Sequence, residues 1–433
     1  MIPASAFAKI LGRRLSATSV APVAVAFSGG GDSLALLLAA RDWGRRRLVV
    51  LTVDHGLNPQ SAAWTRRCGE TAARLGLEFR ALAWTGEKPA TGLPAAARAA
   101  RHALLADAAR EAGARVILMG HTASDLTESA AMRAEGSTVP DAREWGPSPA
   151  WPEGRGVFLF RPMLGLARDD IRDWLRTRGE TWIDDPANED VKYARARARK
   201  SSPGGGGGPP RRGGGGGQCD LHGSEKSEAD RLRASAGRGS HTDPLHHAAH
   251  GPPPPPGEDC WFELPRATPL QILAAACLCA AGTTRPPRGD RLQRLADRLA
   301  TAETFTATLA GARIEARPDR VLITRDAGEL SQDPTPLPPN QPIVWDGRFE
   351  LTATQPGLTV RPLAGLSRRL PATERAALTR LPAAVRPGLP VIVDQSGAVS
   401  CPILAGSGAV RCEVLTMARF DAAIGLVQSE PDM

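Results

Sequence analysis

The sequence predicts an α/β fold with a parallel, Rossmann-like sheet, followed by a linker and a smaller α+β region. Short apolar runs alternate with helical patterns between residues 22 and 135, and continuous apolar strands are typical of a parallel sheet covered on both faces. A turn with three glycines joins the first apolar run to the first helical pattern at residues 28–33. Ligands bind such sheets beyond the carboxyl ends of the strands, so this turn is the first candidate for a binding site.

The predicted elements follow one another in a regular order. We expect strands at residues 23–27, 48–53, 79–84 and 115–119, and helices at about 33–43, 59–75, 93–112 and 122–134. Asn58 and Pro59 are a favourable cap and first-turn pair for the second helix, and Gly76 is a favourable stop. One edge of the sheet therefore carries the loops at 28–33, 54–58 and 120–125.

The next part of the chain is predicted to be a loop and then a helix. Residues 136–157 are rich in glycine and proline, and we expect an ordered surface loop that carries Trp145 and Trp151. A helix follows at about 168–178, with an inward face of Ile171, Trp174 and Leu175.

Residues 201–257 differ from the rest of the chain. They contain two runs of five glycines and one run of five prolines, and such a composition cannot bury enough apolar surface to fold. We interpret the segment as a disordered linker, which is either a genuine insertion or the product of a frame slip in a GC-rich gene. Its cysteine and histidines match no standard metal-ligand spacing.

Regular patterns return after the linker. Helical patterns cover 268–281 and 289–303, and two strands are expected to meet at a turn near Pro318 and Asp319. A proline-rich joint precedes the last strand-like runs, which are 349–353, 390–393 and 408–415. The predicted domains are 1–200, 201–257, 258–330 and 343–433, with the joint at 333–342.

Composition and charge narrow the classes of function. The net charge of +8 and the pI of about 9.5 favour a nucleic-acid partner. No apolar run approaches the roughly 20 residues of a membrane span, and no signal peptide is visible, so we expect a cytoplasmic protein without a membrane partner. Seven scattered cysteines without a C-x-x-C pair indicate a reducing compartment and argue against a zinc or redox motif.

The glycine-rich turn has the chemistry of a phosphate site. Glycines at 29–31 leave the first N–H groups of a helix open to a polyanion, and Ser28 and Ser33 add hydroxyl donors. Asp32 would repel a bare phosphate, so its presence implies a metal ion such as Mg²⁺. No G-K-S/T sequence follows, which excludes a Walker A loop. S-G-G-x-D-S resembles the PP-loop of the ATP pyrophosphatases, which split ATP between its α and β phosphates.

Four further motifs lie after the glycine-rich turn. They are VDHGLN (53–58), AARAARHALL (96–105), GHTASDLTESAAMR (120–133) and WIDDPANEDVKYARARAR (182–199). In this order and spacing they resemble the tRNA(Ile)-lysidine synthase family, closely over about 20–200 and weakly over about 305–405. The resemblance implies a ligase for tRNA modification. Its expected substrates are ATP, L-lysine and a tRNA(Ile) with a CAU anticodon, whose first anticodon cytidine becomes lysidine.

The resemblance also implies roles for individual residues. Asp125 and Glu128 stand three apart on one helix face, and the family's use of these acids assigns them to the substrate lysine. Ser124 stands where the family often has a further acid. The expected ATP-binding residues are Ser28, Gly29, Gly30, Gly31, Asp32, Ser33, Val53 and His121. The catalytic candidates are Asp32, Arg101, Asp125 and Glu128, and Asp32 is also the candidate magnesium ligand.

Several positions keep two interpretations. His121 either contacts the nucleotide or substrate, or is a structural residue at a helix start. Arg101 either faces the phosphates or the cytidine, or keeps an alanine-rich helix soluble. Asp54 and His55 end the second strand near the expected adenosine, and a metal role is their less favoured interpretation. The candidates for contact with the cytidine or the tRNA backbone are Asp184, Asp185, Asn188, Arg195, Arg197, Arg199 and Arg361.

The sequence leaves three alternatives to the lysidine-forming ligase. A tRNA thiolase of the same superfamily needs catalytic cysteines near the loops, yet Cys68 is the only cysteine in the first 200 residues. An amidotransferase-type synthetase needs a glutamine-handling domain, and none is visible. The non-enzyme rival is a catalytically impaired RNA-binding relative, which the break at 201–257 would favour. The sequence names neither the general base for the lysine amine nor the oligomeric state, for which a homodimer is one option.

Overall fold

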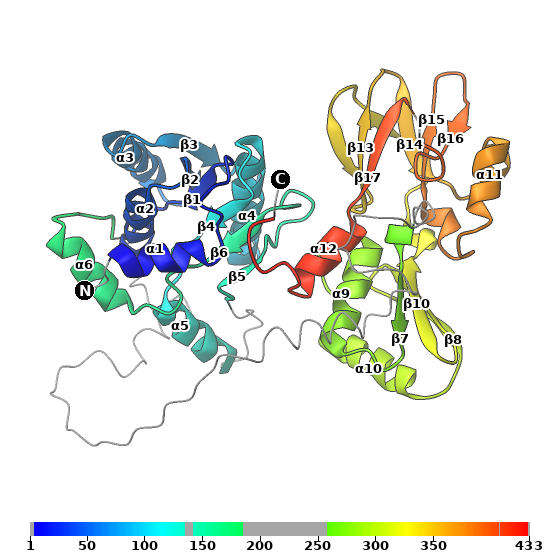
Figure 1. Ribbon diagram of the computed structural model, residues 1–433, viewed down its shortest axis with the longest axis horizontal. Helices are drawn as coiled ribbons and strands as arrows, with labels where there is room; N and C mark the ends of the chain where they lie inside the picture. The colour runs from blue at the N-terminus through cyan, green and yellow to red at the C-terminus, as the bar shows by residue number, and fades with distance from the viewer. Residues whose placement is uncertain (1–3, 135–141, 185–257, 407, 432–433) are drawn as a thin grey trace. The chain divides into compact units, whose positions relative to one another are not determined.

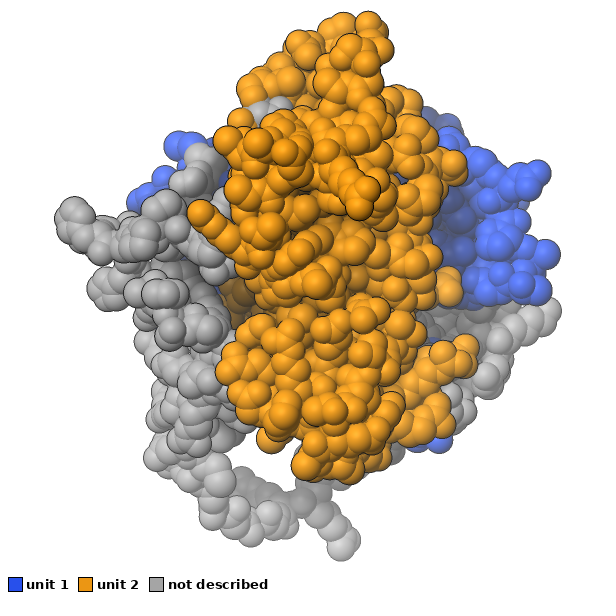
Figure 2. Space-filling view, turned by 90° about the vertical axis from the view of Figure 1, so that its right-hand side faces the viewer, with its two compact units in different colours: residues 1–220, 427–433 blue, residues 221–426 orange. Residues whose placement is uncertain are grey.

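The computed structural model describes residues 4–134, 142–184, 258–406 and 408–431. The chain divides into two compact units, Met1–Asp220 with Val427–Met433, and Leu221–Leu426 (Figure 2). The predicted linker at 201–257 lies outside the described residues. Among the helices that are described, none is long and apolar enough to cross a membrane.

The first unit is built on a six-stranded sheet with the order β3-β2-β1-β4-β6-β5 (Figure 1). Its strands are β1 (Val23–Ala26), β2 (Leu48–Asp54), β3 (Glu78–Ala83), β4 (Val116–Leu118), β5 (Trp145–Pro147) and β6 (Phe158–Phe160). All neighbours pair in parallel except β5, which runs antiparallel to β6 at one edge. The predicted Rossmann-like sheet is confirmed, and its strand order reverses between β1 and β4, where such sheets bind ligands.

Among the described residues, the helices that accompany this sheet are α1 (Ala4–Gly12), α2 (Gly31–Trp43), α3 (Ser61–Arg74), α4 (Leu93–Glu111), α5 (Ala123–Ala134) and α6 (Arg168–Thr177). The chain moves outward from β1 to β3 and then returns to β4. Right-handed crossovers therefore place α2 and α3 on one face and α4 on the other. Both faces of β1 are buried. Ala24 packs with the α4 residues Leu105 and Ala109, and its neighbours Val23 and Val25, which point to the opposite face, are also buried.

The predicted surface loop at 136–157 is wrong in part. Residues 142–157 include β5, and Trp145 is buried, with its ring stacked on Phe158 at a centroid distance of 5.1 Å. The glycine and proline around Trp145 hid a three-residue strand, and β6 was not predicted either. In α6, Ile171 and Leu175 are buried as expected, whereas Trp174 is only half-buried.

In the described part of the second unit, which starts at residue 258, a helix pair packs on an antiparallel sheet. The helices are α9 (Leu270–Ala281) and α10 (Gly289–Ala300), and the sheet order is β7-β10-β9-β8. Its strands are β7 (Phe262–Pro265), β8 (Phe305–Leu309), β9 (Ala312–Ala316) and β10 (Arg320–Arg325). Three strands, not the predicted two, follow α10. The missed turn is formed by Ala310 and Gly311, both with positive φ, and the turn near Pro318 is confirmed.

The rest of the second unit consists of two small sheets, β11-β14-β15-β16 and β12-β13-β17. The strands are β11 (Thr335–Leu337), β12 (Pro342–Trp345), β13 (Phe349–Ala353), β14 (Leu358–Pro362), β15 (Pro390–Val393), β16 (Val399–Ser400) and β17 (Val410–Val414). The expected joint at 333–342 thus contains β11 and the start of β12. The helices are α11 (Ala372–Leu378) and α12 (Thr416–Ala423), and Phe420 of α12 packs on Phe262 at 4.6 Å.

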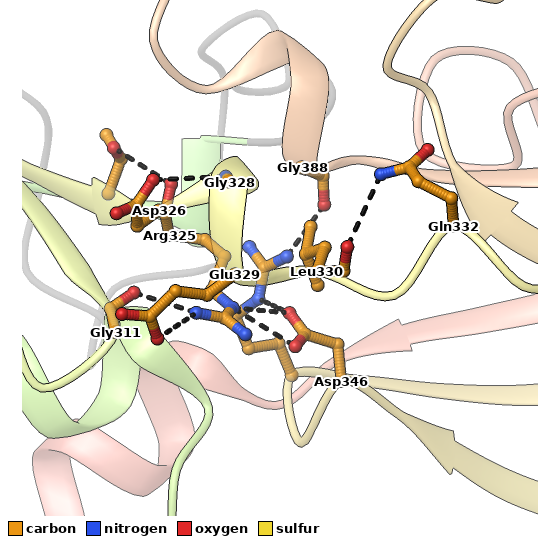
Figure 3. A network of polar contacts seen from close by, with 11 residues as sticks. Gly311, Arg325, Asp326, Gly328, Glu329, Leu330, Gln332, Asp346 and Gly388 are labelled. Carbon is orange, nitrogen blue, oxygen red and sulfur yellow. Dashed lines mark hydrogen bonds and ion pairs between the residues drawn. The ribbon is translucent and has the colours of Figure 1, made fainter.

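A buried ionic cluster ties the two halves of the second unit together (Figure 3). Arg325, at the end of β10, and Arg348, just before β13, both bind the carboxylate of Asp346, at N–O distances of 3.1 and 2.7 Å. Arg348 also donates to the carbonyl of Gly388. Gly282 admits this turn, because a Cβ there would lie 2.0 Å from the carbonyl oxygen of Asp346.

The C-terminal residues belong to the first unit. Glu430 forms a buried ion pair with Arg46 at 2.8 Å, and their side chains are 4% and 1% exposed. The backbone N–H of Glu430 donates to the carbonyl of Arg14, and the indole of Trp145 donates to the carbonyl of Val427. The first unit is therefore completed by residues from both ends of the chain.

Candidate active site

The glycine-rich turn connects β1 to α2, as the sequence predicts. Ser33 holds its shape: its hydroxyl accepts from the backbone N–H of Ser28 at 3.2 Å, and it donates to the carbonyl of Gly30 at 2.9 Å. The N-terminus of α2 therefore lies at the carboxyl edge of the sheet, with its positive dipole end beside the turn. Such an arrangement suits the phosphates of a nucleotide.

A second loop crosses this turn. Gly120 follows β4, and a Cβ at Gly120 would lie 3.0 Å from the Cα of Ser33 and 3.2 Å from the carbonyl carbon of Asp32. Only a glycine allows the backbone to approach so closely. This contact brings His121 and the start of α5 against the glycine-rich turn. Gly120 was not among the predicted site residues, although its place after an apolar strand is visible in the sequence.

The glycines also make room for the chain's own residues. Gly29 has a φ of +81°, and a Cβ there would lie 2.5 Å from Cδ1 of Ile183. The backbone N–H of Ile183 donates to the carbonyl of Gly29, and Trp182 lies at van der Waals distance from a Cβ at Gly31. Residues 182 and 183 therefore line the turn, which gives the glycines a second role beside approach to phosphate.

Three carboxylates meet at one arginine. Arg168, the first residue of α6, contacts Asp32 from Nε at 3.0 Å and Glu128 from Nη1 at 3.0 Å. Its Nη2 lies 3.4 Å from Asp125. The structure thus brings together Asp32 with the predicted lysine-binding pair, Asp125 and Glu128. Sequence reasoning missed Arg168, whose neighbours Asp169 and Asp170 mark only an ordinary helix start.

The cluster shifts the protonation of its members. Burial raises the pKa of Asp32, and this effect outweighs the charge of Arg168, which lowers it. Burial also raises the pKa of Asp125, but the N–H of Thr122 and the charge of Arg168 more than offset it and leave the pKa below its usual value. Burial alone would lower the pKa of Arg168, whereas the surrounding carboxylates raise it above its usual range. Arg168 is therefore always charged.

A second, cationic group lies beside the first. Nε of Arg161 donates to Nδ1 of His121 at 3.1 Å, so this ring is neutral and carries its proton on Nε2. Burial lowers the pKa of His121 to about 3, with Arg161 and Arg101 among the further causes. Arg101, on α4, is also among the charges that lower the pKa of His55, for which burial is the larger cause.

Cys68 lies under the glycine-rich turn but is not a nucleophile. A Cβ at Gly29 would lie 3.1 Å from Sγ of Cys68. The side chain is buried, and burial raises the pKa of the thiol to about 11. A thiolase needs an accessible thiolate, so this site does not fit the thiolase alternative.

The other predicted residues are placed as follows. Val53 is half-buried near the end of β2, and Asp54 accepts from the N–H of Gly56 at 2.8 Å, which shapes the turn. Arg361 is half-buried on β14 in the second unit. Asp184 accepts from the indole of Trp182 at 3.0 Å. Outside the described residues lie Asp185, Asn188, Arg195, Arg197 and Arg199.

The donor set fits a magnesium ion only if the nucleotide supplies further oxygens. Among the described residues, no group of three or more metal-ligating side chains could hold an ion by itself. Asp32, however, places one carboxylate at the turn where phosphates are expected. Mg²⁺ commonly uses one or two carboxylates together with substrate phosphates and water, and Asp32 meets that requirement.

The chain is similar to several known proteins. The family model of the PP-loop domain matches residues 4–202. A tRNA(Ile)-lysidine synthase of Caulobacter vibrioides is 48% identical over 97% of this chain and 97% of its own length. One of Hyphomonas neptunium is 36% identical over 73% of this chain and 83% of its own length. A solved U34-tRNA thiolase of Methanococcus maripaludis covers 45% of this chain and 71% of its own, with 14% identity and a TM-score of 0.38.

Proposed function

We propose a division of roles in the active site on the premise that this chain belongs to the tRNA(Ile)-lysidine synthase family. The chain is accordingly an ATP-dependent ligase that forms a carbon–nitrogen bond. It joins L-lysine to carbon 2 of the cytidine at the first anticodon position of tRNA(Ile), and AMP and pyrophosphate leave. The observation that carries the assignment of roles is the meeting of Asp32, Asp125 and Glu128 at the guanidinium of Arg168.

The first step takes place at the glycine-rich turn. The oxygen on carbon 2 of the cytosine attacks the α-phosphate of ATP, a bond to this oxygen forms, and pyrophosphate leaves. The N–H groups of the turn and the dipole of α2 stabilise the charge that builds on the phosphates. Arg101 contributes further positive charge from α4, and the Nε2 proton of His121 is held ready to donate by Arg161. Asp32 would hold Mg²⁺, which neutralises phosphate charge when it is bound.

The second step takes place at the carboxylates of α5. Asp125 and Glu128 bind the ammonium group of the substrate lysine, because two acids on one helix face attract a cation. The ε-ammonium group loses a proton to water, its amine nitrogen forms a bond to carbon 2, and the bond from carbon 2 to the adenylated oxygen breaks. AMP leaves with that oxygen. Arg195, Arg197, Arg199 and Arg361 are proposed to contact the tRNA backbone.

A labelling assay tests the reaction. The purified chain is incubated with a tRNA(Ile) transcript bearing CAU, radiolabelled lysine, ATP and magnesium, and Asp32→Ala is assayed in parallel. We expect label in the tRNA that requires ATP and disappears in the variant. If the wild-type chain exchanges pyrophosphate into ATP in the presence of this tRNA but transfers no lysine, the proposed lysine step is wrong.

A further inference from the structure

The first residue of α6 is a cation in contact with the acids of the active site. Arg168 stands where the positive end of the helix dipole disfavours a cation, and its side chain is only 14% exposed. Buried charges are normally paired, so the contacts of this cation indicate what it does. The acids of the same helix turn, Asp169 and Asp170, offset the local cost.

The use of Arg168 follows from the geometry of its fork. Each of the three guanidinium nitrogens faces a different carboxylate, at 3.0, 3.0 and 3.4 Å. Asp32 comes from the turn after β1, and Asp125 and Glu128 come from the helix after β4. Arg168 is therefore a direct link between the nucleotide half and the α5 half of the site.

We propose that Arg168 is a positioning residue that holds Asp32, Asp125 and Glu128 in one register, so that the use of ATP and the use of lysine depend on the same guanidinium. The expected effect on lysine use rests on the proposed function. The expected effect on ATP binding rests only on the glycine-rich turn. The planar fork is required, because a lysine at this position would offer one nitrogen to three separated acids.

The carboxylates repel one another without this cation. All three carboxylates lie within 3.0 to 3.4 Å of one guanidinium, so their negative charges are close to one another. Removal of Arg168 leaves three buried or half-buried acids without their shared partner. We expect Asp32 to leave the turn and the α5 acids to lose their orientation.

The test compares Arg168→Ala, Arg168→Lys and Arg176→Ala. Arg176 is the matched control, because it lies on the same helix, is exposed and pairs only locally, with Asp173, in the contacts described. Direct ATP binding, tRNA-dependent pyrophosphate exchange and the KM for lysine are measured for each folded variant. We expect Arg168→Ala to weaken ATP binding and to raise the lysine KM, each by about tenfold or more, and Arg176→Ala to change neither.

Chemical rescue separates positioning from a general structural role. Added guanidinium ion, at millimolar concentrations below those that unfold the protein, should restore part of the activity of Arg168→Ala, because it fits the space between the same three acids. Arg168→Lys should recover less than guanidinium does. Guanidinium should not raise the activity of Arg176→Ala or of the wild type.

The outcomes distinguish this inference from the proposed function. If the wild type binds ATP but transfers no lysine, the proposed function fails. The effect of Arg168→Ala on ATP binding then still tests whether Arg168 positions Asp32. If the wild type makes lysidine and folded Arg168→Ala keeps both constants, the positioning role is wrong. A loss of activity that guanidinium does not rescue, with unchanged ATP binding, also overturns it.

Discussion

Gly120 and Ser33 are in such close contact that the loop after β4 and the turn after β1 form one surface. A Cβ on Gly120 would lie 3.0 Å from the Cα and 3.1 Å from the N of Ser33. Two stretches that are about ninety residues apart in the sequence thus build a single edge of the site. The position of α5, and with it of Asp125 and Glu128, depends on this contact.

Gly120→Ala should therefore impair the binding of both ATP and lysine. The added methyl must push the loop away from α2, and such overpacking costs about 1–3 kcal/mol of unfolding free energy. We expect higher KM values for ATP and for lysine, measured by steady-state kinetics beside urea unfolding. Gly146→Ala is the control, because a Cβ at Gly146 meets no atom within 4 Å. Equal behaviour of the two variants would contradict the close-contact argument.

The buried pair of Arg46 and Glu430 should be a major stabilising contact of the first unit. Glu430→Ala leaves a guanidinium that is 1% exposed without its carboxylate, and removal of one partner of a buried pair costs about 3–5 kcal/mol. Urea unfolding measures the loss. Asp173→Ala breaks an exposed pair with Arg176 and should cost at most about 1 kcal/mol. A cost for Glu430→Ala as small as that of Asp173→Ala would show that the C-terminal residues do not dock in solution.

His102 should make the protein less stable in mild acid. Burial, with the charges of Arg101, Arg98, Arg161 and His121, lowers the pKa of His102 from 6.5 to about 3. Below pH 6.5 this residue binds a proton in the unfolded chain but stays neutral in the native state. Stability from this residue is therefore lost as the pH falls from about 6.5 towards 3, at about 1.4 kcal/mol per pH unit.

His102→Leu removes this proton uptake and tests it directly. We expect the variant to lose less unfolding free energy than the wild type between pH 6.5 and 4, in urea titrations at each pH. Other groups titrate over the same range in both proteins, so only the difference between the two slopes is interpreted. Parallel slopes would mean that His102 is protonated in the native state.

Cys68 should be dispensable for catalysis. Its thiol is buried and has a pKa of about 11, so almost no thiolate is present at neutral pH. We expect Cys68→Ala to keep lysine transfer within about threefold of the wild type, and native Cys68 to resist iodoacetamide at pH 8. Rapid alkylation of Cys68 with loss of activity would reopen the thiolase alternative.

Much of the first unit follows from local sequence. The strand before Ser28, the glycine-rich turn and the helix after it form a contiguous pattern, and their predicted bounds differ by only one or two residues from those observed. Trp145 escaped prediction because its strand is three residues long and lies among glycine and proline, so its hydrophobic face is defined only by Phe158 across the sheet. The turn at Ala310 was missed because alanine rarely adopts a positive φ.

The site was predictable in part for the same reason. Asp32, Asp125 and Glu128 lie in motifs whose chemistry is visible in one dimension. The role of Arg168 could not be predicted from the sequence, because nothing in its own helix distinguishes it from Arg172 or Arg176. Its role comes from acids on α2 and α5 that are more than thirty residues away, and tertiary contacts of that kind are not encoded in a local pattern.

The most direct test of the account is the lysine dependence of Glu128→Gln, with Glu144→Gln as a control at a carboxylate that pairs with Arg13 and Arg14. Lysine transfer to tRNA is measured over a range of lysine concentrations, beside tRNA-dependent pyrophosphate exchange in the absence of lysine. We expect a lysine KM raised by about tenfold or more for Glu128→Gln, with exchange retained, and no change for Glu144→Gln. An unchanged lysine KM in folded Glu128→Gln would contradict the claim that the α5 acids bind the amino acid.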